Sequence, residues 1–266
     1  MENALKVCLF PMPIKWRDKQ ANLEALSAMM EKVHPATDLL ILPEMFSTGF
    51  LTGADKEEIR TYAERNTGET IDFIKRLAAH YGMAIAGSFI ADSGGSLYNR
   101  AFLIEPNGDE FFADKRHLFS MAGEQKIFSP GYERLAVRYR GWNIAMIVCY
   151  DIRFPVWCRN VDNSYDLLIA VANWPVARVD AWNQLLKARA IENEAYVCGV
   201  DCKGTDDKDF EYDGSSMVID FKGKEISKAD IATGLIYGTL HRDKLEAFRT
   251  KFPAWRDADP FKIIEK

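Results

Sequence analysis

The sequence is poor in the residues that build metal sites and disulfide frameworks. It has four histidines, none in the two-residue or four-residue spacing of zinc ligands, so we predict no metal site. Its five cysteines are an odd number scattered along the chain, which favours reduced thiols in a cytoplasm. Two of them, Cys198 and Cys202, fall on one face of a predicted strand, where buried, unreactive thiols are expected. Any chemistry should therefore come from ordinary side chains.

The sequence also lacks long apolar runs and long basic runs. Its longest apolar stretch lies around Ile144 to Tyr150, far too short to span a bilayer. Residues 1–6 contain no basic segment followed by an apolar one, so no secretory signal is expected. With 34 Lys+Arg against 39 Asp+Glu, the net charge is −5, which argues against nucleic acid or an anionic membrane as the main partner. With the scattered cysteines, these absences favour a cytoplasmic location.

No Pro-rich or Ser-rich linker, composition shift or internal repeat divides the chain. Hydrophobic residues make up 48% and charged residues 27%, a balance that excludes intrinsic disorder. A chain of 266 residues can bury a sizeable core. Residues 1–266 are therefore predicted to form a single domain.

Short apolar runs alternate with helical patterns early in the chain, and consecutive strands follow in the middle. The predicted strands are 4–10, 39–42, 83–90, 97–104, 110–113, 135–139, 143–149, 167–172, 196–200, 216–219 and 231–240. The predicted helices are 21–33, 70–81, 180–195 and 241–252. This order predicts an α/β (α+β) protein with a mixed sheet of many strands and helices packed outside.

Two predicted strands end in charged residues. The aliphatic segment from Leu39 runs through Pro43 into Glu44, and a glutamate in that place should be partly desolvated, as suits a general base. The next such strand runs from Glu110 to Lys115, whose ammonium can present a fixed cation to an oxyanion. Taken alone, each segment favours an ordinary capping or solvated charge.

A third predicted strand runs directly into Cys149. The turn that follows contains Pro155, a residue that suits the first turn of a helix. A thiol at a sharp turn from strand to helix lies near backbone amides that stabilise a thiolate and can bind an oxyanion. The alternative for this segment alone is a buried, inert cysteine.

The three segments indicate a function more strongly together than each does alone. A base, a cation and a thiol that each close a buried strand can converge at one rim of a sheet. Hydrolysis of an amide by a thiol needs those three roles. A proton must move from sulfur to the departing nitrogen, and the negative oxygen that forms in between must be stabilised. Glu44, Lys115 and Cys149 are therefore the predicted catalytic residues.

These segments resemble the three signature segments of the nitrilase (carbon–nitrogen hydrolase) superfamily, in the same order. They are Leu42-Pro43-Glu44, Asp114-Lys115-Arg116-His117-Leu118 and Val148-Cys149-Tyr150-Asp151-Ile152-Arg153-Phe154-Pro155. The likeness extends over nearly the whole chain. Further segments resemble the bacterial ω-amidase-like branch: Met45-Phe46-Ser47-Thr48-Gly49-Phe50, His117-Leu118-Phe119-Ser120-Met121-Ala122-Gly123-Glu124, Asn173-Trp174-Pro175 and Leu185-Leu186-Lys187-Ala188-Arg189-Ala190-Ile191-Glu192-Asn193.

The resemblance implies a four-layer α-β-β-α sandwich that commonly forms a homodimer. It implies cofactor-independent hydrolysis of a small carboxylic amide through a thioester on Cys149, with release of ammonia. Glu44 would be the general base, and Lys115 with the Tyr150 backbone amide would stabilise the oxyanion. Glu124 matches the family's second glutamate, which positions the lysine and the substrate amide. The substrate implied is 2-oxoglutaramate or 2-oxosuccinamate.

Such a substrate carries a carboxylate far from its amide, so the pocket should hold a cation or donor for it. Arg153 follows the nucleophile closely and is one candidate, although an ion pair with Asp151 explains it equally well. Phe119 and Trp174 are candidates for apolar walls of the pocket, with core packing as the alternative for each.

One segment departs from the ω-amidase pattern. Where Gly-Val-Asn-Arg is expected, the chain has Gly199-Val200-Asp201-Cys202, which exchanges an amide and a cation for an acid and a thiol. Substrate preference is uncertain if these positions touch the pocket. The alternatives are a nitrilase-branch amidase for N-carbamoyl amino acids or deaminated glutathione, a thiol hydrolase that pairs Cys149 with His117, and a non-catalytic binding scaffold.

Overall fold

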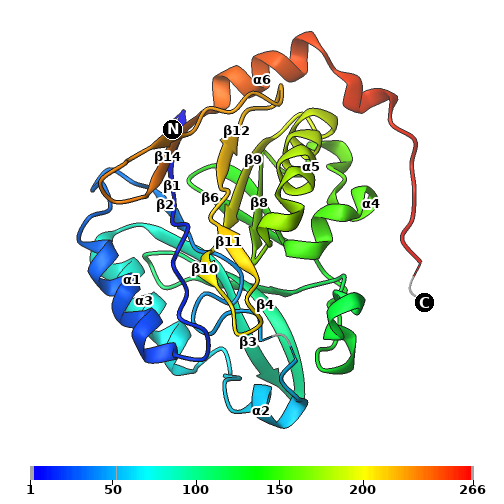
Figure 1. The fold of residues 1–266 in the computed structure, drawn as a ribbon. Coiled ribbons are helices and arrows are strands. Elements are labelled where there is room, and N and C mark those ends of the chain that lie inside the picture. The colour runs from blue at the N-terminus through cyan, green and yellow to red at the C-terminus, as the bar shows by residue number, and fades with distance from the viewer. Residues whose placement is uncertain (1–2, 52, 265–266) are drawn as a thin grey trace.

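Two β-sheets packed face to face form the centre of the protein (Figure 1). The computed structural model describes residues 3–51 and 53–264. One sheet has the spatial order β13-β14-β1-β2-β3-β4-β5. Its strands are β1 (Ala4–Leu9), β2 (Leu39–Ile41), β3 (Ala84–Ser93), β4 (Ser96–Ile104), β5 (Glu110–Asp114), β13 (Lys228–Ala229) and β14 (Ile236–His241). Strands β1, β2 and β3 pair in parallel, and the other pairs are antiparallel.

The second sheet has the order β12-β9-β8-β7-β6. Its strands are β6 (Leu135–Tyr139), β7 (Trp142–Val148), β8 (Leu167–Ala172), β9 (Tyr196–Asp201) and β12 (Met217–Ile219). Strands β7, β8 and β9 are parallel, while the two edge strands pair antiparallel to their neighbours. A separate hairpin consists of β10 (Lys203–Thr205) and β11 (Glu211–Asp213).

The helices are α1 (Lys19–Met30), α2 (Lys56–Arg60), α3 (Glu69–Tyr81), α4 (Pro155–Cys158), α5 (Val179–Glu192) and α6 (Arg242–Lys251). Helices α1, α3 and α5 cover the outer faces of the sheets, whereas α6 places Leu245 in the core between them. Helices α1 and α3 lie side by side on the first sheet, and α5 lies on the second (Figure 1). The layers therefore run helix, sheet, sheet, helix, which confirms the predicted four-layer α-β-β-α sandwich. Within the described residues, each helix is too short or too polar to cross a membrane.

Alternation along the strands explains the layers. Leu39 and Ile41 of β2 point into the core between the sheets, whereas Leu40 between them packs under α1 and α3. In the second sheet, Ile169 of β8 faces the first sheet and Leu168 packs against α5. Because both faces of each sheet are covered, these strands read as continuous apolar runs in the sequence.

The predicted elements differ from the observed ones mainly at their ends. The strand predicted over 231–240 begins only at Ile236, because a turn organised by Asp230 precedes it and leaves Ile231 98% exposed. Helix α1 begins two residues earlier than predicted, where the Asp18 carboxylate accepts a hydrogen bond from the Ala21 amide. Helix α5 ends at Glu192 rather than Ala195. The short elements α2, β10, β11 and β13 were not predicted, since they carry too few residues for a periodic signal, and α4 was indicated only by Pro155.

Candidate active site

Cys149 occupies a strained position between β7 and a 3-10 helix that spans Cys149–Arg153. Its φ is +47°, in the left-handed region that non-glycine residues rarely adopt. The buried Asp151 carboxylate holds this turn by accepting the amides of Val148 at 3.1 Å and His117 at 2.8 Å. Pro155 is the first residue of α4, as predicted from its preference. The predicted strand to Cys149 ends one residue earlier, at Val148, because the backbone turns at the thiol.

Glu44 lies three residues beyond β2 and is 1% exposed. Its Oε1 accepts hydrogen bonds from Lys115 Nζ at 3.0 Å and from Asn99 Nδ2 at 2.7 Å. Its Oε2 accepts the Asn173 backbone amide at 2.9 Å. The next residue, Met45, has a φ of +43°, so a second strained residue adjoins a predicted catalytic side chain. These contacts fix the carboxylate in one orientation.

Lys115 follows β5 directly and is fully enclosed, with 2% of its surface exposed. Besides Glu44, its ammonium contacts both carboxylate oxygens of Glu124, each at 3.0 Å. Glu124 is also buried, and its Oε2 accepts the Phe119 amide at 2.5 Å. One buried cation is therefore shared by two carboxylates. Gly131 lies so close to the end of this strand that a Cβ there would stand 2.1 Å from the Asp114 carbonyl oxygen.

Burial and charge set the protonation of this cluster. Burial disfavours the charged form of Lys115, but the carboxylates of Glu124 and Glu44 outweigh it and raise the pKa of the lysine. Burial raises the pKa of Glu124, as does the Glu44 charge, while the Lys115 ammonium opposes both. The lysine is therefore a permanent cation at neutral pH.

The Cys149 thiol faces the same cavity as the Glu44 carboxylate. Burial and the Glu44 charge raise the pKa of the thiol well above its ordinary value, although the Lys115 cation opposes them. The resting Cys149 side chain is thus a neutral thiol in the neighbourhood of the Glu44 carboxylate.

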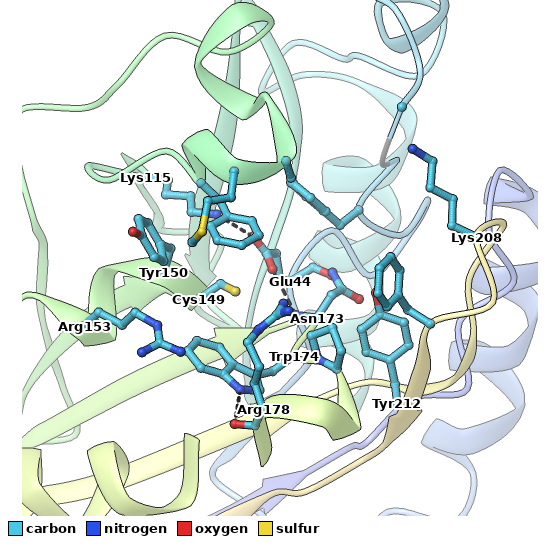
Figure 2. A pocket seen from close by; sticks show the side chains of 17 residues that line it. Glu44, Lys115, Cys149, Tyr150, Arg153, Asn173, Trp174, Arg178, Lys208 and Tyr212 are labelled. Atoms are coloured by element: carbon cyan, nitrogen blue, oxygen red, sulfur yellow. Dashed lines mark hydrogen bonds and ion pairs between the residues drawn. The ribbon is translucent and has the colours of Figure 1, made fainter. Parts of the chain in front are cut away.

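A cavity of about 440 Å³ opens above this group (Figure 2). Its lining residues are Glu44, Phe50, Gly53, Lys115, Phe119, Met121, Ala122, Cys149, Tyr150, Arg153, Asn173, Trp174, Pro175, Arg178, Lys208, Phe210 and Tyr212. The structure thus brings together Glu44, Lys115, Cys149 and Tyr150, with Glu124 directly behind the lysine. The three candidate pocket residues, Phe119, Arg153 and Trp174, also line the cavity. Arg153 makes no ion pair with Asp151; its guanidinium lies over the Trp174 ring, 4.8 Å from the centroid.

Asn99, Asn173, Arg178 and Lys208 are among the residues of the site that received no role from the sequence. Asn99 and Asn173 hold the Glu44 carboxylate, and the Asn173 side chain also donates to the Glu44 carbonyl oxygen at 2.8 Å. Asn99 is an amide within the apolar strand β4, and a buried polar residue of this kind was the available signal. Arg178 and Lys208 lie in segments without a strong pattern, and only the folded chain places them at the cavity.

The structure keeps His117 and the departing segment out of the cavity. His117 Nδ1 lies 2.8 Å from Asp151 Oδ1, and its ring stacks on Phe154. Asp201 is fully buried, and its Oδ1 accepts the amides of Trp174 at 2.7 Å and Cys202 at 2.9 Å. Asp201 therefore holds the segment that carries Trp174, and neither it nor Cys202 lines the pocket.

No group of three or more His, Cys, Asp or Glu side chains in residues 3–51 and 53–264 is arranged to hold a metal ion. All five cysteines are free thiols. Of these, Cys8, Cys158, Cys198 and Cys202 are buried, and Cys149 is the partly accessible one. The site offers a thiol, a carboxylate and an ammonium as its reactive groups.

Known proteins resemble this chain over nearly its whole length. The carbon–nitrogen hydrolase family model matches residues 6–250. The chain is 39% identical to omega-amidase YafV of Yersinia enterocolitica, over 98% of this chain and 100% of that protein. It is 28% identical to the 2-oxoglutaramate amidase of Bacillus subtilis strain 168, over 92% and 93% of the two chains. The crystal structure of XC1258 from Xanthomonas campestris, a CN-hydrolase superfamily protein with an arsenic adduct in its active site, aligns with a TM-score of 0.92 at 37% identity, over 98% and 99% of the chains.

Proposed function

The chain belongs to the carbon–nitrogen hydrolase family, and from that premise we propose that it is an ω-amidase. It hydrolyses the terminal amide of a short 2-oxo dicarboxylic acid monoamide, 2-oxoglutaramate or 2-oxosuccinamate, to ammonia and the 2-oxo diacid. The observation that carries this proposal is the enclosed contact of Lys115 with Glu44 and Glu124 in the cavity that contains Cys149. The names of the two relatives support the substrate class.

The first half of the reaction forms a thioester. Cys149 Sγ attacks the amide carbon while Glu44 takes the thiol proton, which offsets the raised pKa of the thiol. The carbonyl oxygen becomes negative and is stabilised by the Lys115 ammonium and the Tyr150 backbone amide. Glu44 then passes the proton to the nitrogen, the carbon–nitrogen bond breaks, and ammonia leaves.

The second half returns the enzyme to its starting state. A water molecule takes the place of ammonia, and Glu44 removes one of its protons as the oxygen attacks the thioester carbon. The same two donors stabilise the second tetrahedral oxyanion. When it collapses, the carbon–sulfur bond breaks and the Glu44 proton returns to Cys149 Sγ, which releases the carboxylic acid.

Glu124 acts on the lysine and on the substrate amide in this scheme. Its two oxygens hold the Lys115 ammonium at 3.0 Å, and the Phe119 amide holds one of those oxygens in turn. The lysine therefore faces the cavity with fixed geometry before the substrate arrives, which is the arrangement that lowers the barrier for a developing oxyanion.

A substrate panel followed by ammonia release tests the proposal. The purified enzyme should release ammonia fastest from 2-oxoglutaramate or 2-oxosuccinamate, and far more slowly from glutamine, a simple nitrile or an N-carbamoyl amino acid. Cys149→Ala should lose turnover almost completely while its melting temperature is retained. Cys198→Ala, whose cysteine lies in the core between the sheets, should keep its turnover. Fastest turnover of the N-carbamoyl amino acid, or normal rates in Cys149→Ala, would refute the assignment.

We also propose that the enzyme works in the cytoplasm as a homodimer. The five free thiols support a reducing compartment, and the dimer rests on the family resemblance. Light scattering coupled to size exclusion should give about twice the 30.2 kDa mass of the chain; the mass of a monomer would contradict the dimer.

A further inference from the structure

The mouth of the cavity carries a charge opposite to that of the whole chain. Of the charged residues in its lining, Glu44 and Lys115 pair with each other. The other three are cations, Arg153, Arg178 and Lys208, and none forms an ion pair with a carboxylate in the described part of the chain. In a protein with a net charge of −5, three uncompensated cations at one opening attract an anion.

Hydrogen bonds fix the backbone of Arg178, and its side chain points into the cavity. It ends the 3-10 helix Val176–Arg178, its amide donates to the Pro175 carbonyl at 2.9 Å, and its carbonyl accepts Trp174 Nε1 at 2.7 Å. Its guanidinium lies 5.5 Å from the centroid of the Phe119 ring. Figure 2 shows the side chain extending past the Trp174 indole toward the middle of the cavity. Its guanidinium presents five N–H donors in a planar fork that matches a carboxylate.

The other two cations lie at the margins. Arg153 approaches the opposite side of the Trp174 indole and stacks on it (Figure 2). Lys208 stands on the loop between β10 and β11, which Asp206 organises by accepting the amides of Lys208 and Phe210. Its ammonium lies above Gly53, at the right-hand edge of the view. Neither points to the middle of the cavity as Arg178 does.

We infer that Arg178 is a specificity-determining residue that binds the free carboxylate of the substrate at the end far from the amide; this inference rests on the proposed function. In a five-carbon monoamide the carboxylate carbon lies about 5 Å from the amide carbon when the chain is extended. The methylene groups between them pass Phe119 and Trp174, which form the apolar walls of this part of the cavity. Arginine pairs with carboxylate through two parallel hydrogen bonds, so the site selects an acid over a neutral amide.

The test compares a charged and a neutral substrate of equal length. Wild type, Arg178→Met, Arg153→Met and Lys208→Met are assayed for ammonia release from glutaramate, the five-carbon monoamide with a carboxylate, and from pentanamide, which has none. Arg178→Met should lower kcat/KM for glutaramate roughly 10- to 100-fold, mostly through KM, and change pentanamide less than about 3-fold. Arg178→Lys should recover part of the loss. The other two variants should change the ratio of the substrates far less.

Three results would overturn the inference. They are an unchanged glutaramate KM in Arg178→Met, an equal loss for both amides, and a larger loss in Arg153→Met or Lys208→Met. A wild-type enzyme that hydrolyses neither 2-oxoglutaramate nor glutaramate would instead refute the proposed function. The two failures are therefore distinguishable, and a melting temperature for each variant excludes unfolding as the cause of a loss.

Discussion

Replacing Glu124 by glutamine tests whether the second carboxylate positions the catalytic lysine. The substitution keeps the shape of the side chain but removes its charge and turns one acceptor oxygen into an NH₂ group. That NH₂ group must face either the Lys115 ammonium at 3.0 Å or the Phe119 amide at 2.5 Å, and both of these are donors. Because Lys115 contacts both oxygens of Glu124, it loses one of these contacts in either orientation of the amide, and the lysine becomes free to move toward Glu44.

The size of the effect follows from the contact that is lost. A hydrogen bond that involves a charged group contributes about 1.5–3 kcal/mol. If that contact is needed to hold the oxyanion cation in place, the barrier rises by the same amount, which corresponds to a fall in kcat of about 10- to 150-fold. Because Glu44 still holds Lys115 at 3.0 Å, the fold should survive.

The assay is ammonia release from 2-oxoglutaramate under saturating conditions, with a melting curve for each protein. Glu133→Gln is the matched control, since Glu133 is exposed and lies outside the cavity. The control should equal wild type, and Glu124→Gln should lose activity in kcat with an intact melting transition. A Glu124→Gln enzyme with a kcat within 2-fold of wild type would show that the carboxylate does not position the lysine.

Three further substitutions probe the surroundings of the thiol. Lys115→Met should destabilise the protein by about 3–5 kcal/mol at pH 7, because two buried carboxylates lose their cation. Urea unfolding should show a smaller loss of stability at pH 5, where carboxylates bind protons more readily. An equal loss at both pH values would contradict this. His117→Ala should leave the shape of the pH profile of kcat/KM unchanged, since His117 contacts Asp151 and not the cavity; loss of one limb would favour a Cys–His pair. Burial raises the pKa of Asp201 well above its ordinary value, so the folded state holds a proton that the unfolded state releases above about pH 4. This contribution to stability falls as pH rises toward the folded pKa, so Asp201→Asn should gain stability relative to wild type between pH 5 and pH 8, and a constant difference in unfolding free energy would refute the shift.

The sequence predicts the strand and the turn around Cys149 well because their signal is local. An aliphatic strand, a cysteine, and a proline six residues later indicate where the strand ends and the next helix begins. The left-handed backbone at Cys149 could not be read in this way, because the Asp151 carboxylate that holds the turn also binds the His117 amide from a distant strand end. Strain of this kind persists only where tertiary contacts fix it.

The cluster around Glu44 depends on residues that are distant in the chain. Its carboxylate accepts hydrogen bonds from Lys115 and Asn173, which lie 71 and 129 residues away. The sequence predicts that strand ends can converge, but not which amides complete the site. For the same reason Asn99 has no visible role until strand β4 pairs with its neighbours.

The amino-acid sequence alone determined the layered fold class, the reactive segments and their family. The short motifs indicate the family and, through it, the four-layer sandwich, whereas periodicity alone predicted a mixed sheet with helices outside and the structure has two such sheets. Only the tertiary structure decided the rest: the orientation of Arg178 into the cavity, the separation of His117 from it, and the burial of Asp201 behind Trp174. These depend on how two sheets and their loops pack, and a side chain's solvent, charge partners and neighbours are set by that packing rather than by its place in the chain.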